Sequence, residues 1–402
     1  MSSPPPPRPS LEMLRALTDE NVLRALMDRP RLTRAEISAH TGISKPTISD
    51  SVARLSAAGL VVDTGERTAG RGRAGSYYCL APRLGAALVA SITPHGVVAE
   101  AVDAHGRVVE QVRAGLGRTA GADLAARTLA AVAGRLRTRV PGGLRTAVVS
   151  AADPVDRTTG RLVRLPDAPF LVGDLDPAAV LASSVTGPVL VDNDVNWAAR
   201  AEHHAGRAQG VDDFVYVHLG EGLGCAVVHD GAVRRGRHGL AGEIAHLHTA
   251  GPDGTAMPLT EVFAALGLRR PASTAIDVAA LESAVAGDDE RARRVRTVLA
   301  RAISGVLAAA VSLADPEMIV VGGAWGSRPR MIAAIGDHFG HSPRPVRVAA
   351  AGLTAPELTG ARTRALEELR SLVVRSARPA GDRTPSKGRA PSSPAPRAIG
   401  DR

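Results

Sequence analysis

The sequence is poor in cysteine. Cys79 and Cys225 are its only two cysteines, too few and too far apart for a disulfide framework or a cysteine zinc site. We interpret both as structural thiols, which suits a reducing cytoplasm. Lysine is equally scarce, since Lys45 and Lys387 are the only two, so the net charge of +9 comes almost wholly from arginine. That balance fits a GC-rich genome as well as polyanion binding.

Long hydrophobic runs are also missing. Nowhere do eighteen uninterrupted apolar residues occur, and the N-terminus, MSSPPPPRPS, lacks a charged segment followed by an apolar core. These absences argue against a membrane span and an export signal, and they predict a cytoplasmic chain with no membrane partner. The 402 residues, 45% of them apolar, suffice for two or three folded units.

Composition divides the chain into four parts. Residues 1–9 are rich in proline and residues 376–402 in arginine, proline, serine and glycine. We expect both to be disordered, because they have few apolar side chains to bury. Residues 10–82 form a compact, mainly helical segment, and residues 83–375 alternate short β-rich runs with alanine-rich helical stretches.

The N-terminal segment contains a helix pair. Thr33 and Glu36 stand in capping-box register, which predicts a helix start at Thr33. Gly42 makes a tight turn, after which Ser44 is placed to cap a second helix. Pro46 lies in the first turn of that helix, where its missing N–H costs nothing.

The second helix has an apolar face and is followed by a basic loop. Ile48, Val52 and Leu55 share one side, and the strand-like runs LVVD and SYYCL enclose GERTAGRGRAG, which predicts a wing. Taken singly, the helix pair would be an ordinary αα-hairpin and the basic loop would be a solvated run of charged residues. Together they favour DNA, with the helix in the major groove and the loop in the minor groove. The residues expected to contact double-stranded DNA are Ser44, Lys45, Pro46, Thr47, Ser49, Arg54, Arg67, Arg71 and Arg73.

The longer segment places polar residues where ligands usually bind. In GPVLVDNDVNWAARAEHHAG, Asn193 and Asp194 lie where a strand ends and a helix begins, a position that reaches a cleft, although a simple N-cap is the competing account. HGLAGEIAHLH puts Glu243 and His246 three residues apart, on one side of a helical turn. Glycines within residues 220–224 would let backbone amides approach a phosphate, or would simply form a Gly-rich hairpin.

These motifs resemble the ROK (repressor, ORF, kinase) family in order and spacing. The match runs through RAEISAHTGISKPTIS and a Gly-Arg wing, then VDNDVNWAARAE, AGEIAH, a GG after a strand and a late GAR helix. The resemblance implies an α/β fold: a winged helix-turn-helix, then an actin-like sugar-kinase-type domain with two RNase-H-like lobes, about residues 83–195 and 196–375. It also implies that a sugar or sugar derivative is bound by Asn193, Asp194, Glu243, His246 and Glu261.

Departures from the family argue against phosphoryl transfer. Kinase members have an Asp-x-Gly-x-Thr turn where this chain reads SITPHG, so a magnesium-holding carboxylate is missing and Pro94 removes an amide. Glu221 stands where the family has a small hydroxyl residue, and its charge should repel a triphosphate. Asp194 would be the base of a kinase, but without ATP it has nothing to transfer. We therefore expect no catalytic residue and no cofactor.

Other departures concern metal and ligand. The family's zinc site adds three cysteines to a histidine at the His246 position, but this chain reads GPDGTAMPLTE there. His246 and His248 alone are too few ligands for structural zinc, so no metal is expected. Asp153 replaces a glycine of the family's Pro-Gly turn and Asp167 replaces an asparagine, so the ligand need not be a plain hexose.

The sequence leaves three classes of function open. The first is a DNA-binding regulator, expected to be a repressor, whose degenerate kinase domain binds a sugar or sugar derivative. The others are an active sugar kinase and a DNA binder whose second domain is a dimerisation scaffold. A homodimer or tetramer on a palindromic operator is expected, because two-fold proteins read two-fold sites.

Overall fold

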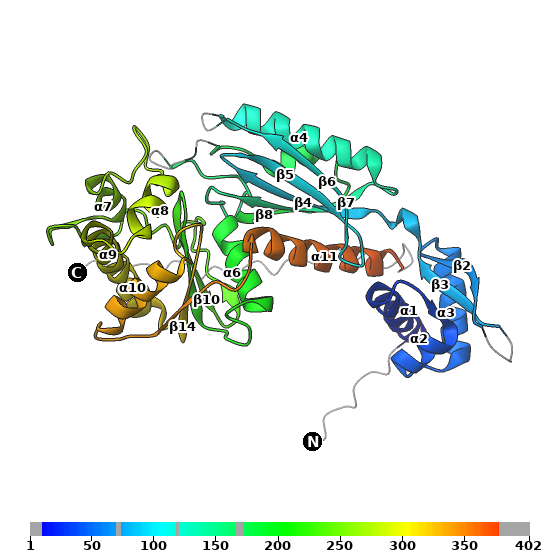
Figure 1. Cartoon of the computed structure of the whole chain (residues 1–402). Helices are drawn as coiled ribbons and strands as arrows, with labels where there is room; N and C mark the ends of the chain where they lie inside the picture. The colour runs from blue at the N-terminus through cyan, green and yellow to red at the C-terminus, as the bar shows by residue number, and fades with distance from the viewer. Residues whose placement is uncertain (1–9, 70–73, 118–119, 166–169, 171, 378–402) are drawn as a thin grey trace, which may run out of the picture.

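The computed structural model of the chain describes residues 10–69, 74–117, 120–165, 170 and 172–377. Three bodies follow one another in Figure 1: a small winged helix, a first lobe and a second lobe. The expectation of disorder for residues 1–9 and for the tail beyond residue 377 falls outside the described residues.

The N-terminal body has three helices and a three-stranded sheet. Its elements are α1 (Leu11–Asp28), β1 (Leu32–Thr33), α2 (Arg34–Thr41), α3 (Lys45–Ala57), β2 (Val61–Arg67) and β3 (Ser76–Leu80). The Thr33 hydroxyl accepts a hydrogen bond from the Glu36 N–H, and the Glu36 carboxylate accepts one from the Thr33 N–H, which confirms the predicted capping box. Gly42 ends α2 with φ of 71°, a conformation that glycine adopts without strain.

The helix α3 buries the face that its sequence predicted. Ile48, Val52 and Leu55 are buried. Ser44 stands at the N-cap position, but its hydroxyl bonds the Thr47 hydroxyl (2.8 Å) and no backbone amide, so the expected side-chain cap is not formed. The strands β2 and β3 pair antiparallel, which confirms two strands joined by a wing.

The first lobe is a five-stranded sheet in the order β6-β5-β4-β7-β8. Its elements are η1 (Pro82–Leu84), β4 (Ala86–Thr93), β5 (Gly96–Val102), β6 (Val108–Gly115), α4 (Ala122–Arg139), β7 (Leu144–Ala151), α5 (Pro177–Leu181) and β8 (Val189–Asn193). The central strand β4 is apolar from Ala86 to Ala90 because both of its faces are covered. Leu88 and Ala90 pack on the side of α4, whereas Ala87 and Val89 face the opposite layer of helices.

The second lobe repeats this topology. Its sheet order is β11-β10-β9-β14-β15, and in both lobes the first three strands pair antiparallel and the last two join in parallel. The remaining elements of the chain are α6 (Asp194–Ala205), β9 (Phe214–Leu219), β10 (Leu223–His229), β11 (Ala232–Val233), β12 (His248–Ala250), β13 (Ala256–Pro258), α7 (Leu259–Ala265), α8 (Val278–Ala286), α9 (Glu290–Ala314), β14 (Met318–Gly322), α10 (Pro329–Gly340), β15 (Arg347–Ala350) and α11 (Pro356–Ser376).

The helix α9 is, among the described helices, the one long and apolar enough to cross a membrane. Its residues Leu299, Ile303 and Leu307 are buried in the core of the second lobe. Packing in this core accounts for its apolar composition.

The C-terminal helix α11 corrects the expected lobe division at residues 195 and 196. It returns to the first lobe and packs on β4, β7 and α6, as Figure 1 shows. At Gly360 an added Cβ would lie 2.0 Å from the Trp197 carbonyl oxygen, so the close crossing of α11 and α6 requires glycine. α6 itself also contacts β9 and β10, and therefore joins the two lobes.

Candidate functional site

A cavity of about 310 Å³ lies between the two lobes. We call it the interlobe cavity. Its walls come from the ends of β4, β7, β8 and β9, the first turns of α6 and α11, and the loop of residues 239–246. Ligands of open α/β sheets bind at the carboxyl ends of the strands, and the volume lies at the lower end of the ~300–1,000 Å³ range of small-molecule sites.

Asn193 and Asp194 both line the interlobe cavity. The Asn193 side-chain oxygen accepts a hydrogen bond from the Val195 N–H, and its amide nitrogen donates to the carbonyl oxygens of Ala151 and Asp153. The N-cap account therefore describes Asn193, and its amide hydrogens are already engaged. Asp194 accepts one hydrogen bond, also from the Val195 N–H (2.8 Å).

Glu243 and His246 line the cavity from a loop, not from the helical turn that their spacing suggested. Gly242 holds this loop against β10, because an added Cβ there would lie 1.8 Å from the Cys225 carbonyl oxygen. The two residues thus reach one site through backbone packing, which their spacing alone did not reveal.

Glu261 is the predicted cavity residue that the structure places elsewhere. Its half-exposed carboxylate pairs with Arg269 at 2.6 Å, and its neighbour Thr260 lines the cavity instead. Successive helical side chains point about 100° apart, so adjacent residues of α7 face different ways. The expectation of a fifth ligand contact at Glu261 is corrected accordingly.

Two further carboxylates enter the cavity without having been predicted as site residues. Asp153 follows β7, is 4% exposed, and receives no side-chain hydrogen bond from the described residues. Glu357 lies in the first turn of α11. Asp153 was visible only as a departure from a family turn, and no local motif marks Glu357. Asp167, the other expected departure, lies outside the described residues.

Among the described residues, five carboxylates line the cavity, and Glu221 is one of them. The other four, Asp153, Asp194, Glu243 and Glu357, which we call the four cavity carboxylates, resist ionisation. Burial and the Glu243 charge raise the pKa of Asp153 to about 7. Burial, followed by the Glu357 charge, raises the pKa of Asp194 to about 7. Glu243 is open to the cavity, yet the surrounding walls raise its pKa to about 7. Burial also raises the pKa of Glu357.

The two turns that would contact the phosphates of a nucleotide in a kinase are joined by a side-chain contact. His95 Nε2, after β4, lies 3.2 Å from a carboxylate oxygen of Glu221, after β9. The other Glu221 oxygen pairs with Arg270 (3.1 Å). Next to this pair, burial lowers the pKa of His218 to about 4 and keeps it neutral. The Glu221 carboxylate therefore joins the turn after β4 to the turn after β9.

The winged helix exposes part of its predicted DNA face. Lys45, Pro46 and Thr47 are exposed on α3, and Ser49 is half-buried. Arg67 of β2 is half-exposed and pairs with Asp63 (3.0 Å). Arg71 and Arg73 lie outside the described residues. DNA contact by these residues stays a prediction.

Arg54 has a structural partner. Its guanidinium pairs with the buried carboxylate of Asp19 (2.6 Å), which also accepts a hydrogen bond from the Ser51 hydroxyl (2.5 Å). The interaction joins α3 to α1, so Arg54 fixes the angle at which α3 is presented. Its predicted DNA contact would have to be made alongside this pair.

The structure separates the two histidines considered for zinc. His246 lines the cavity, whereas His248 is exposed on β12. Within the described part of the chain, Asp213, His229 and Asp230 have the mutual spacing that a metal ion needs, and they lie on the surface. The absence of a zinc site stays a prediction.

The helix α11 connects the cavity with the winged helix. Near its other end, Arg370 donates hydrogen bonds to the Met27 carbonyl (3.0 Å) and the Ala104 carbonyl (3.0 Å), and it pairs with Asp28 (3.3 Å). His105 Nδ1 also lies 3.1 Å from the Met27 carbonyl. The carboxyl end of α1 is thus held by the same helix that carries Glu357.

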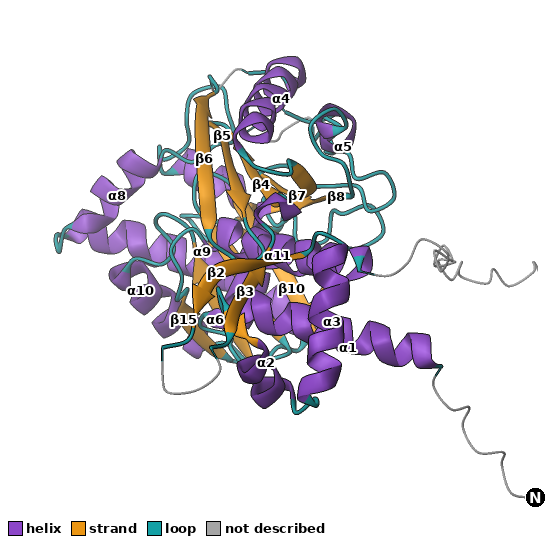
Figure 2. Cartoon of the chain, turned by 90° about the vertical axis from the view of Figure 1, so that its right-hand side faces the viewer, coloured by secondary structure: helices purple, strands orange, loops and turns teal. Residues whose placement is uncertain are grey.

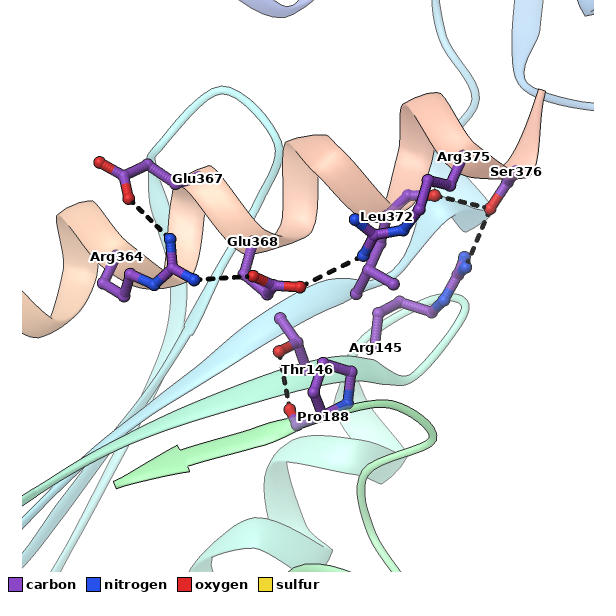
Figure 3. Close-up of polar contacts among 9 residues, drawn as sticks. All are labelled: Arg145, Thr146, Pro188, Arg364, Glu367, Glu368, Leu372, Arg375 and Ser376. Carbon is purple, nitrogen blue, oxygen red and sulfur yellow. Dashed lines mark hydrogen bonds and ion pairs between the residues drawn. The ribbon is translucent and has the colours of Figure 1, made fainter. Parts of the chain in front are cut away.

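Apolar packing supports this connection. One hydrophobic cluster contains Leu23 and Leu26 of α1 together with Leu369 and Val373 of α11. Figure 3 shows ion pairs along α11, from Arg364 to Glu367 and Glu368 and from Glu368 to Arg375, and a hydrogen bond from Arg145 of β7 to Ser376. These pairs support a continuous helix.

Comparison with known proteins agrees with this architecture. Residues 98–342 match the model of the ROK family and residues 21–72 match that of the MarR family. The first match covers more than half of the chain, so the chain belongs to the ROK family. It has a MarR-type winged helix-turn-helix in front of a two-lobed, sugar-kinase-like α/β domain.

Relatives include both enzymes and a regulator. The chain is 31% identical over 175 residues to the bifunctional enzyme NanE/NanK of Brucella melitensis, covering 42% of this chain but only 34% of that protein. It is 26% identical to the N-acetylmannosamine kinase of Citrobacter koseri, covering 52% of this chain and 80% of the kinase.

Among solved structures, a ROK family transcriptional regulator, a homologue of the E. coli MLC protein, superposes with a TM-score of 0.62 at 19% identity, covering 90% of this chain and 99% of that one. A ROK family glucokinase from Streptomyces griseus, in complex with glucose and AMPPNP, gives 0.54 at 24% identity, covering 70% and 100%. These likenesses concern the fold.

The raised pKa of Asp153 predicts a pH-dependent gain in stability for Asp153→Asn. The pKa of the Asp153 carboxyl is about 7 in the folded protein, whereas its ordinary value is 3.8. The contribution of the protonated carboxyl to the stability of the folded state is therefore complete below about pH 3.8 and is lost as the pH rises to about 7. Asp153→Asn should raise the free energy of unfolding at pH 8 by on the order of 2 kcal/mol, and by much less at pH 5. Urea unfolding of the full chain measures this. The exposed control Asp337→Asn should change little, and a gain that is equal at both pH values would contradict the assignment.

Proposed function

We propose that this protein is a sequence-specific DNA-binding transcriptional repressor whose kinase-like domain binds a sugar or sugar derivative in the interlobe cavity. One observation carries the proposal: a single helix, α11, supplies Glu357 to the cavity and holds the end of α1 through Arg370. A pure kinase has no need of a winged helix attached in this way. The protein acts in the cytoplasm.

The coupling follows from the length and packing of α11. Thirteen residues separate Glu357 from Arg370, which is about 20 Å at 1.5 Å per residue. The loop before α11 is pinned to α6, because the buried Glu202 carboxylate accepts hydrogen bonds from the N–H groups of Gly352 and Leu353. A ligand that pulls on Glu357 and Asp194 would therefore move α6 and α11 as a unit and reorient the winged helix.

The DNA-bound form is proposed to be a homodimer on a palindromic operator, with a tetramer as the alternative. The first half of α1 exposes apolar side chains, and Figure 2 shows it projecting from the body. Exposed apolar patches often mark protein–protein contacts. The side chains concerned are Leu11, Met13, Leu14 and Leu17.

Substitutions in the winged helix should fall into two groups. Lys45→Ala, Thr47→Ala and Ser49→Ala should each cost ~1–3 kcal/mol at particular base pairs, because these residues are expected to face bases. Arg71→Ala should weaken binding to every sequence and lower the salt slope by about one unit. Titrations of a footprinted operator and a scrambled duplex at several salt concentrations measure both effects. Arg291→Ala on α9 is the control for lost charge, and equal losses on both duplexes for all four variants would mean that α3 is not the recognition helix.

Arg370→Ala should uncouple the two sites. Typical allosteric couplings of ~1–3 kcal/mol alter affinity roughly 5- to 150-fold, and we expect the sugar to release the operator by a factor in this range. Without the Arg370 contacts the factor should fall toward one, while sugar affinity stays within about twofold. The matched control is Arg364→Ala, which removes ion pairs within α11 only. An Arg370→Ala protein that releases DNA as fully as the parent would rule out this route.

The kinase alternative rests on the enzymes among the relatives. With magnesium, ATP and a panel of hexoses and amino sugars, we expect no sugar-dependent ADP production, because Glu221 and Pro94 occupy the phosphate turns. Coupled enzyme assays measure ADP. Sustained ADP production that disappears in Asp194→Asn would show that this protein is a sugar kinase.

A further inference from the structure

The interlobe cavity has an excess of acidic groups. Among the described residues that line it there is no lysine or arginine. Its histidines do not balance the four cavity carboxylates: His95 pairs with Glu221, burial keeps His218 neutral, and His246 is a single group beside four carboxylates. Arginines of the surrounding elements are paired elsewhere: Arg235 with Asp192, Arg270 with Glu221, and Arg362 with Glu100.

Among the four cavity carboxylates, Asp153 gives the strongest indication that a hydrogen-bond donor is required. It is 4% exposed, it lines the cavity, and its carboxylate receives no hydrogen bond from the described residues. The Glu243 carboxylate likewise has no hydrogen-bond donor among them. A buried carboxylate without a donor is unfavourable, so Asp153 is an acceptor prepared for a partner that the described residues do not provide, and the exposed carboxylate of Glu243 lines the same cavity.

We propose that the ligand of the interlobe cavity is a cationic polyol, a sugar or cyclitol with at least one free, protonated amino group. Asp153 and Glu243 would accept hydrogen bonds from its ammonium group, while Asp194 and Glu357 would accept from its hydroxyls. Phe170 and Leu165 line the cavity as well and offer an apolar surface to the carbon face of the ring. This inference rests on the proposed sensor function and narrows its ligand class.

Other ligand chemistries fit the cavity less well. A sugar phosphate or uronic acid would add negative charge to four carboxylates. A neutral sugar would satisfy their hydrogen bonds but not their charge, whereas an ammonium group favours the ionised forms and would lower the raised pKa values. A single metal ion is disfavoured by geometry, because the described cluster with suitable mutual spacing is the surface group Asp213, His229 and Asp230.

Matched pairs of ligands test the proposal. Calorimetric titration of the full chain near neutral pH would compare glucosamine with glucose, galactosamine with galactose, mannosamine with mannose, and 2-deoxystreptamine with myo-inositol. N-acetylated hexosamines serve as probes that keep the shape and lose the charge. In at least one pair the amine should bind tenfold or more tightly, and Asp153→Asn and Glu243→Gln should each remove most of that preference. The exposed control Asp337→Asn should keep it.

The outcomes separate this inference from the sensor function. A neutral or N-acetylated sugar that binds more tightly than its amine and shifts operator binding would overturn the cationic ligand and leave the sensor standing. A preference for the amine that persists in both Asp153→Asn and Glu243→Gln would also overturn it. If no compound binds while operator binding is intact, the sensor function fails and this inference fails with it.

Discussion

The packing of α11 against the first lobe is the constraint on which the rest of the structure depends. Gly360 lets the helix approach the Trp197 carbonyl closely, and packing on α6, β7 and β4 holds the helix along its length. One end places Glu357 in the interlobe cavity, and the other places Arg370 against Met27 and Asp28 of the winged helix. A side chain larger than hydrogen at Gly360 would separate α6 from α11 and displace both sites together.

The interlobe cavity joins this mechanical arrangement to chemistry. In a kinase the turns after β4 and β9 would grip a nucleotide, but here His95 and Glu221 bind one another across them. The sugar side, in contrast, gathers carboxylates whose pKa values are raised chiefly by burial. A ligand at this site can shift α6 and α11 from one arrangement to another only if it binds the two arrangements with different affinity.

Most local signals in the sequence predicted the structure correctly, although the Ser44 cap and the helical turn of Glu243 and His246 were wrong, and the long-range contacts were not predicted. The capping box of Thr33 and Glu36, the apolar face of α3 and the two wing strands depend on residues a few positions apart. Glu357 reaches the cavity only because the last helix returns to the first lobe, and the pairing of Arg54 with Asp19 joins two helices distant in sequence. The prediction for Glu261 was wrong for a local reason, because adjacent helical side chains point in different directions and Thr260 lines the cavity instead. The resemblance supplied the fold and two of the cavity carboxylates, Asp194 and Glu243, but not Asp153, a departure from the family, or Glu357.

The most direct test of coupling through α11 is reciprocal linkage on one preparation of the full chain. The dissociation constant of the tightest-binding sugar is measured with and without saturating operator duplex, and that of the operator with and without saturating sugar. Each ligand should weaken the other by the same factor, within the range of roughly 5- to 150-fold. A sugar that binds in the cavity with the same affinity in the presence and absence of operator would contradict this coupling.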